Sequence, residues 1–252
     1  MSRFIFALAL LVASVTTGAS QGHPELINDF FQGNVTVDSV FEQCTNDRNQ
    51  GNCATIAVIK AALAEFGTID GIFTTFQRDG DSIRCTFRDG TTVAVGRSER
   101  DIVRQTADLR PGNTPTFRED AITLYALISK RMLVRRSAFT PSSSFTKCVR
   151  NYRDVVMYLN SGYPSIHAYR LLALTTIDIT DFAALATTPS AIVYSKGIHA
   201  GFCTMGQQDQ FGDVFPIERE RGRNNRPTGA WLMGTANGNR RKITAAYRLA
   251  LP

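Results

Sequence analysis

The chain has 252 residues, of which 43% are hydrophobic and 20% are charged, and its formal net charge is +6. This apolar content is enough to bury a sizeable core, and the balance of residue types excludes a disordered or fibrous chain. The charge is modest and its basic residues are mostly scattered, which argues against a nucleic-acid-binding protein. The basic run at 219–226 is interpreted as a solvated loop, with contact to phosphates or to an acidic surface as the alternative.

The N-terminal segment 1–20 has the layout of a secretory signal peptide. Arg3 supplies a positive charge, residues 4–15 form an apolar run, and small and polar residues follow. A membrane-spanning helix needs roughly 20 apolar residues, so this run is too short to be an anchor. We therefore expect a secreted protein with no membrane association after signal removal. Residues 21–40 are then a lead-in or propeptide-like segment, and residues 41–252 form the folded domain.

A strongly helical stretch begins at Cys53. Residues 54–66 are good helix formers and are apolar on nearly every side, with Lys60 as an isolated charge. Asn52 stands where an N-cap belongs, and Gly67 stands where a helix ends. A helix that is apolar all round is a buried helix. Cys53 is therefore expected at the N-terminus of a helix inside the protein.

The other predicted elements indicate a mixed α+β fold. Asp-Gly pairs separate the first three β-rich runs, which favours hairpins. The polar segment 97–120 predicts a loop, because it contains two prolines and no sustained apolar period. In chain order, the predictions are strands at 72–77, 82–87 and 91–95, helices at 119–134 and 152–159, and strands at 191–194, 199–205, 230–235 and 244–251.

Five cysteines are present, namely Cys44, Cys53, Cys85, Cys148 and Cys203. A secretory compartment is oxidising and favours pairing, and an odd count leaves one thiol over. If Cys53 is the free thiol, the other four cysteines can form two bridges in any of three connectivities.

Cys53 is the candidate nucleophile. A helix N-terminus and a neighbouring imidazolium both stabilise a thiolate and lower the pKa of a cysteine. A small buried hydrophobe is the alternative interpretation. Among the three histidines, His23 lies beside the expected cleavage site and His167 lies in a segment that looks helical. His199 follows an apolar strand and has small neighbours that leave room for a substrate, so it is the candidate base.

A third group is needed to orient the imidazole and to set its tautomer. Asn237 is the candidate, because it ends an apolar strand and precedes a glycine. An ordinary Asn-Gly turn is the alternative interpretation of that pair. Asn225, Asp209 and Asp213 are rivals for the orienting role.

The segment Gln50–Ala54, which leads into a buried helix, resembles the nucleophile motif of calpain-like, papain-fold cysteine proteases. The segment Gly197–Ala200 resembles the Gly-His-Ala of that family, at a suitable distance from the cysteine. Residues 71–89 and 122–130 resemble further segments of calpain catalytic domains in the same order. Together these segments extend the resemblance over roughly residues 40–250.

This resemblance implies a papain-like, two-lobed α+β fold for residues 41–252, which would be the catalytic domain. A helical lobe would carry the buried nucleophile helix, and a β-rich lobe would carry His199 and Asn237. The implied activity is hydrolysis of a polypeptide substrate through a Cys-His-Asn triad and an acyl-enzyme. We expect no cofactor and no metal, because no EF-hand or zinc-binding motif is present. We also expect a monomer. Calcium dependence is not carried over, because the resemblance does not include the regulatory domains of calpains.

The chain departs from this family just before Cys53. The family places its oxyanion glutamine six residues before the cysteine, where this chain has Asp47. Gln50 is the candidate oxyanion donor in its place. The segment Gln50–Cys53 also resembles the motif of ovarian-tumour-type proteases. The alternatives are a thiol acyl transferase or deubiquitinase-like hydrolase, and a catalytically weak or inactive binding or effector protein on the same scaffold.

Overall fold

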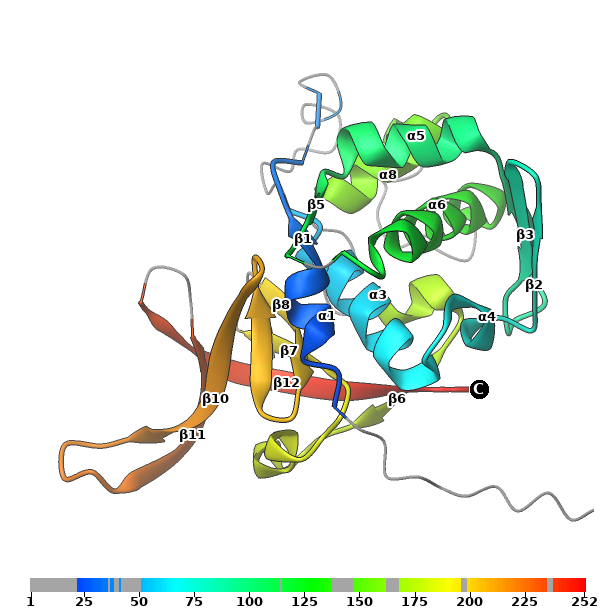
Figure 1. Ribbon diagram of the computed structural model, residues 1–252. Helices are drawn as coiled ribbons and strands as arrows, with labels where there is room; N and C mark the ends of the chain where they lie inside the picture. Colours follow the sequence, from blue (N-terminus) through cyan, green and yellow to red (C-terminus); the bar gives the residue numbers. More distant parts are fainter. Residues whose placement is uncertain are drawn as a thin grey trace, which may run out of the picture.

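The computed structural model has an α+β architecture in which a helical part packs against a larger sheet (Figure 1). It describes residues 22–35, 37, 38, 41, 51–113, 115–136, 147–161, 168–195, 199–234 and 238–252. The predicted α+β class is confirmed at this level. The predicted signal peptide, residues 1–20, lies outside the described residues.

Helix α3 (Cys53–Phe66) lies where the helical part meets the larger sheet (Figure 1). All its residues from Ala54 to Ala64 are buried, as the apolar pattern predicts. The helix ends at Gly67, whose φ of 73° suits glycine and whose N–H donates to the Leu63 carbonyl at 2.9 Å. The predicted buried helix and both of its ends are therefore confirmed.

The other helices of this part are α1 (Glu25–Asp29), α4 (Ile69–Ile72), α5 (Arg97–Thr106), α6 (Arg118–Val134) and α8 (Tyr152–Asn160), with the 3-10 helix η2 (Ala168–Leu172) nearby. Of these helices, α1, α4 and α6 contact α3, whereas α5 and α8 pack against α6 and against each other. Helices α6 and α8 match their predicted ranges closely. A short antiparallel pair of strands, β1 (Phe30–Gln32) and β5 (Leu109–Pro111), lies at the edge of this part.

Helix α5 corrects the prediction of a loop over residues 97–120. Polar contacts rather than an apolar stripe support it, because the carboxylate of Glu99 accepts the Gly96 N–H at 2.9 Å and the Lys130 ammonium at 2.6 Å. Arg104 pairs with Asp101 one turn earlier at 2.6 Å. The apolar period alone misses such a helix because few of its side chains are buried.

Residues 22–35, which fall in the predicted lead-in segment, contribute to the core. Leu26, Ile27 and Phe30 are fully buried against the α3 region. Strand β1 pairs with β5, and this pairing fixes the position of Gln32 opposite Leu109.

A three-stranded antiparallel sheet has the order β2-β3-β4, as the Asp-Gly hairpin signals predict. Its strands are β2 (Thr75–Asp79), β3 (Ser82–Thr86) and β4 (Thr92–Val95). Gly80 and Gly90 in the connections have φ of 54° and 81°, where glycine is favoured.

The larger sheet has the strand order β11-β10-β9-β8-β7-β12-β6. Strand β11 also pairs with β12, so the pairings from β7 to β12 close into a circuit. The strands are β6 (Thr175–Asp178), β7 (Ala191–Ser195), β8 (His199–Thr204), β9 (Gln207–Gln210), β10 (Asp213–Arg221), β11 (Pro227–Gly234) and β12 (Arg240–Ala250), with the 3-10 helix η3 (Phe182–Ala186) between β6 and β7. A second, smaller apolar core that includes Val193, Cys203 and Met233 belongs to this part.

The basic run at 219–226 is only partly a loop, because Arg219 and Arg221 belong to strand β10. The hairpin of β10 and β11 projects from the rest of the sheet (Figure 1), and its tip at 222–226 is largely exposed. In a projecting hairpin, both faces of each strand are in contact with water. The sequence therefore lacks the alternation of apolar and polar residues that predicts a strand.

Three thiols, those of Cys53, Cys85 and Cys203, are free. Cys85 and Cys203 are fully buried in the two cores. The possibility that the four cysteines other than Cys53 form two bridges is therefore not realised, because neither Cys85 nor Cys203 is paired. Cys148 is disulfide-bonded, and Cys44 lies outside the described residues.

Candidate active site

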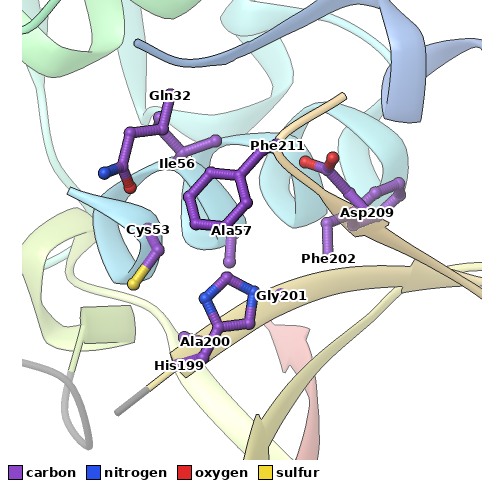
Figure 2. A pocket seen from close by; sticks show the side chains of 10 residues that line it. All are labelled: Gln32, Cys53, Ile56, Ala57, His199, Ala200, Gly201, Phe202, Asp209 and Phe211. Carbon is purple, nitrogen blue, oxygen red and sulfur yellow. The ribbon is translucent and has the colours of Figure 1, made fainter. Parts of the chain in front are cut away.

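Cys53 and His199 line one pocket where α3 meets strand β8 (Figure 2). Cys53 is the first residue of α3, and His199 is the first residue of β8. Figure 2 shows the imidazole of His199 with one ring nitrogen on the side of Cys53. The lining residues are Gln32, Cys53, Ile56, Ala57, His199, Ala200, Gly201, Phe202, Asp209 and Phe211. The structure therefore brings together the predicted nucleophile and the predicted base.

The backbone that leads into Cys53 is held by a buried network. The Gly51 N–H donates to the Asn160 carbonyl at 2.7 Å. The Asn160 side chain accepts from the Tyr125 hydroxyl at 2.7 Å and donates to the Thr106 carbonyl at 2.8 Å. Because these partners come from α5, α6 and α8, three helices together set the position of the start of α3.

Asn52 stands at the predicted N-cap position, but its side chain does not cap the helix. The side chain donates instead to the Ala107 carbonyl at 2.8 Å. The thiol of Cys53 has hydrogen bonds to the backbone at Cys53 itself, at Ala54 and at Ala200 in β8. These donors would stabilise a thiolate, because they place positive dipole ends next to the sulfur.

Burial outweighs these donors at Cys53. It raises the pKa of the thiol, and the backbone hydrogen bonds at Ala200 and Ala54 lower that pKa by less. The expectation that the helix N-terminus leaves Cys53 with a lowered pKa is therefore wrong for this structure. Local sequence shows the helix end, whereas the burial of the thiol arises from the sheet that packs against it.

His199 is neutral in this pocket at pH 7. Burial and, to a smaller extent, the positive charge of Arg241 on β12 lower the pKa of its imidazole to about 4. Its buried Nε2 atom has no hydrogen-bond partner among the residues that the structure describes. A neutral imidazole beside a neutral thiol is an arrangement for general-base catalysis, in which the proton moves when the nucleophile attacks.

Of the other predicted site residues, Asn237 and Gln50 lie outside the described residues. Among the rivals, Asp209 lines the pocket, but its Oδ2 accepts from Lys60 at 2.7 Å and its Oδ1 accepts from the Gly212 N–H at 2.9 Å. Asn225 lies in the turn between β10 and β11, and Asp213 begins β10 as an exposed residue. Asp209 is thus committed to an ion pair and not to the imidazole.

Gln32 is a pocket residue that the sequence analysis did not find. Its side chain reaches the pocket from β1 (Figure 2). The side-chain amide lies against Gly51, where an added Cβ would stand 3.3 Å from Nε2. Within the described part of the chain, its buried Oε1 has no hydrogen-bond partner. Gln32 lies far from Cys53 in the chain, so only the pairing of β1 with β5 brings it here.

Phe211 is the second pocket residue that the sequence analysis missed. It lies in the turn between β9 and β10, and its ring centroid is 5.5 Å from that of His199. With Ile56, Ala57 and Phe202 it makes most of the pocket wall apolar.

Within the described residues, no three His, Cys, Asp or Glu side chains lie close enough together to hold a metal ion. No described helix is long and apolar enough to cross a membrane. The chain matches no protein-family model, no curated protein and no solved structure. The resemblance to calpain-like proteases therefore remains a prediction.

Proposed function

We propose that this protein is a papain-like cysteine endopeptidase in which Cys53 is the nucleophile and His199 is the general base. The observation that carries this proposal is that α3 and β8 present the two side chains to one pocket. The packing of a helical part against a β-rich part, with the pocket where they meet, also supports a two-lobed arrangement. Secretion, a polypeptide substrate and a monomeric state are parts of the same proposal.

In the first step of this mechanism, the neutral imidazole of His199 accepts the thiol proton while the Cys53 sulfur attacks the peptide carbonyl. The resulting imidazolium donates that proton to the leaving amine as the C–N bond breaks. An acyl-enzyme then remains on Cys53. Water attacks this thioester with His199 as the base, which releases the carboxylic acid and restores the thiol.

The negative charge that develops on the carbonyl oxygen requires hydrogen-bond donors. The Gln32 side chain lines the pocket, and its amide group is on the side of Cys53 in Figure 2. We propose that Gln32 supplies this donor, with the backbone N–H of Cys53 as a second one. In this proposal Gln32 of β1 is the oxyanion donor, a role for which the sequence suggested Gln50.

The rate at which iodoacetamide labels Cys53, followed by mass spectrometry from pH 3 to pH 10, tests the nucleophile and base together. We expect labelling near neutral pH to depend on neutral His199 and to fall below about pH 4, where the imidazole becomes protonated. At alkaline pH, labelling should rise again as the thiolate itself forms, because burial raises the Cys53 pKa. His199→Ala should remove the neutral-pH labelling and keep the alkaline rise.

Cys85 and Cys203 are internal controls for this experiment, since both are free and fully buried and should not be labelled in the folded protein. Equal neutral-pH rates in wild type and His199→Ala would remove His199 from the mechanism.

Gln32→Leu should lower kcat for a fluorescein-labelled casein by about 10²–10³-fold, as loss of one oxyanion donor does. The iodoacetamide labelling of Cys53 should change little, because alkylation develops no oxyanion. Gln207→Leu, at an exposed glutamine on β9, is the control and should keep kcat. A Gln32→Leu variant with normal kcat would show that another group holds the oxyanion.

A catalytically inactive binding or effector protein is the second candidate. The raised pKa of Cys53 and the lowered pKa of His199 favour it, because together they keep the pair uncharged. Under this alternative, Cys53 would show only the alkaline labelling, and His199→Ala would change nothing.

A further inference from the structure

Phe211 has a backbone conformation that a bulky residue rarely adopts. Its φ is 57°, and the following Gly212 has φ of 89°. These two residues form the whole connection between β9 and β10. Two-residue hairpin turns with positive φ at both positions favour Asn-Gly, and a large aromatic residue at the first position is unfavourable.

Side chains of neighbouring elements hold the backbone of this turn in place. The Asp209 carboxylate accepts the Gly212 N–H at 2.9 Å, and the same carboxylate pairs with the buried Lys60 of α3 at 2.7 Å. The ring of Phe31 lies so close to Gly212 that a Cβ there would stand 2.7 Å from it. These contacts hold the backbone of the turn at Gly212, and the turn places the Phe211 ring 5.5 Å from that of His199, centroid to centroid.

The ring is not simply part of the core. Phe211 is 44% exposed while it lines the pocket of Cys53 and His199 (Figure 2). An exposed aromatic side chain in an unfavourable backbone conformation needs a reason outside local stability, and such outliers gather at binding sites.

We propose that Phe211 is a specificity-determining residue whose ring contacts an apolar side chain of the substrate next to the scissile carbonyl. This inference rests on the proposed function. A leucine-sized side chain that lies on the exposed part of the ring would bury apolar surface on both partners. The remaining wall, formed by Ile56, Ala57 and Phe202, is apolar as well.

The chain contains a matched control for this proposal. Met205 and Gly206 form the equivalent two-residue connection between β8 and β9, with φ of 50° and 76°. Met205 is 47% exposed, which is close to the value for Phe211, but it does not line the pocket. Replacing either residue by asparagine creates the favoured Asn-Gly turn.

The test compares Cys53 labelling by two peptidyl chloromethyl ketones, one with two leucines and one with two alanines. The Cys53 sulfur displaces chloride in both cases, so the ratio of rates reports the side-chain contact. We expect wild type to prefer the leucine probe. Phe211→Asn should reduce that preference by about tenfold, whereas Met205→Asn should keep it.

Two further readings separate the outcomes. The thermal midpoint of Phe211→Asn should not fall, because the new turn is favourable, and iodoacetamide labelling shows whether Cys53 still reacts in each variant. An unchanged leucine preference in Phe211→Asn, with Cys53 still labelled, would overturn this inference and leave the proposed function standing. Absence of neutral-pH labelling by every probe in wild type would overturn both.

Discussion

Lys60→Met is expected to lower the free energy of unfolding by about 3–5 kcal/mol, the range for removing one partner of a buried ion pair. The Lys60 ammonium is fully buried, and its Nζ donates to Asp209 Oδ2 at 2.7 Å and to the Ile27 carbonyl at 2.9 Å. Methionine matches the aliphatic stem of the lysine but lacks its ammonium group, so it leaves the carboxylate of Asp209 without its cation. Urea unfolding followed by circular dichroism measures the change.

Burying the two charges is itself unfavourable, because burial lowers the pKa of Lys60 and raises that of Asp209. The attraction between the two groups offsets part of this cost. The double variant Lys60→Met with Asp209→Asn should therefore recover much of the loss, since no unpaired charge then remains. Asparagine also keeps an oxygen that can accept the Gly212 N–H. A double variant as unstable as Lys60→Met would show that lost packing, and not the unpaired charge, is the cause.

Arg78→Met is the matched control for Lys60→Met, because Arg78 pairs with Asp120 at 2.9 Å while its side chain is 51% exposed. Exposed ion pairs contribute about 0–1 kcal/mol, so the control should change stability by no more than that. The difference between the two variants reports what burial does to the same kind of contact. An equal loss of unfolding free energy in both variants would contradict the larger effect that we expect for the buried pair.

Cys53→Ala should lower kcat towards casein by about 10³-fold or more, because the variant has no atom that can form the acyl-enzyme. The free energy of unfolding should change by less than about 1 kcal/mol, since alanine is well suited to a helix and the replacement removes a single sulfur atom. Turnover and urea unfolding of the same preparation give both values. A fully active Cys53→Ala variant would exclude Cys53 as the nucleophile.

Cys203→Ala is the control for Cys53→Ala and should show the opposite pattern. Cys203 is fully buried in the smaller core, beside Val193 and Met233 and away from the pocket wall. Its replacement should lower stability by about 1 kcal/mol, because it removes a buried sulfur, and should leave kcat near the wild-type value. Loss of turnover in both variants would point to damage of the fold and not to a lost nucleophile.

Local chemistry was enough to predict the elements that have strong local signals. Helix α3 begins at Cys53 and ends before Gly67 because an apolar run of helix formers lies between an asparagine and a glycine. The Asp-Gly pairs set the hairpins of the three-stranded sheet. His199 was found because it follows an apolar strand and has small neighbours, and these features are visible along the chain.

Elements supported by contacts between distant residues were missed. Helix α5 depends on partners such as Lys130 in α6. Strand β9 is short and rich in glutamine, so only its pairing with β8 and β10 makes it a strand. Such sequences lack an apolar period, because their stability comes from partners far away in the chain.

The sequence by itself determined the buried helix that begins at Cys53 and the strand that begins at His199, and it proposed these two residues as a pair. The tertiary structure alone decided that Gln32 and Phe211 join them, because Gln32 comes from β1 and Phe211 from the turn between β9 and β10, and neither has a local motif. It also decided the protonation of the pair. Local sequence places Cys53 at a helix N-terminus, which lowers a pKa, but packing between helix and sheet buries the thiol, and desolvation is the larger effect.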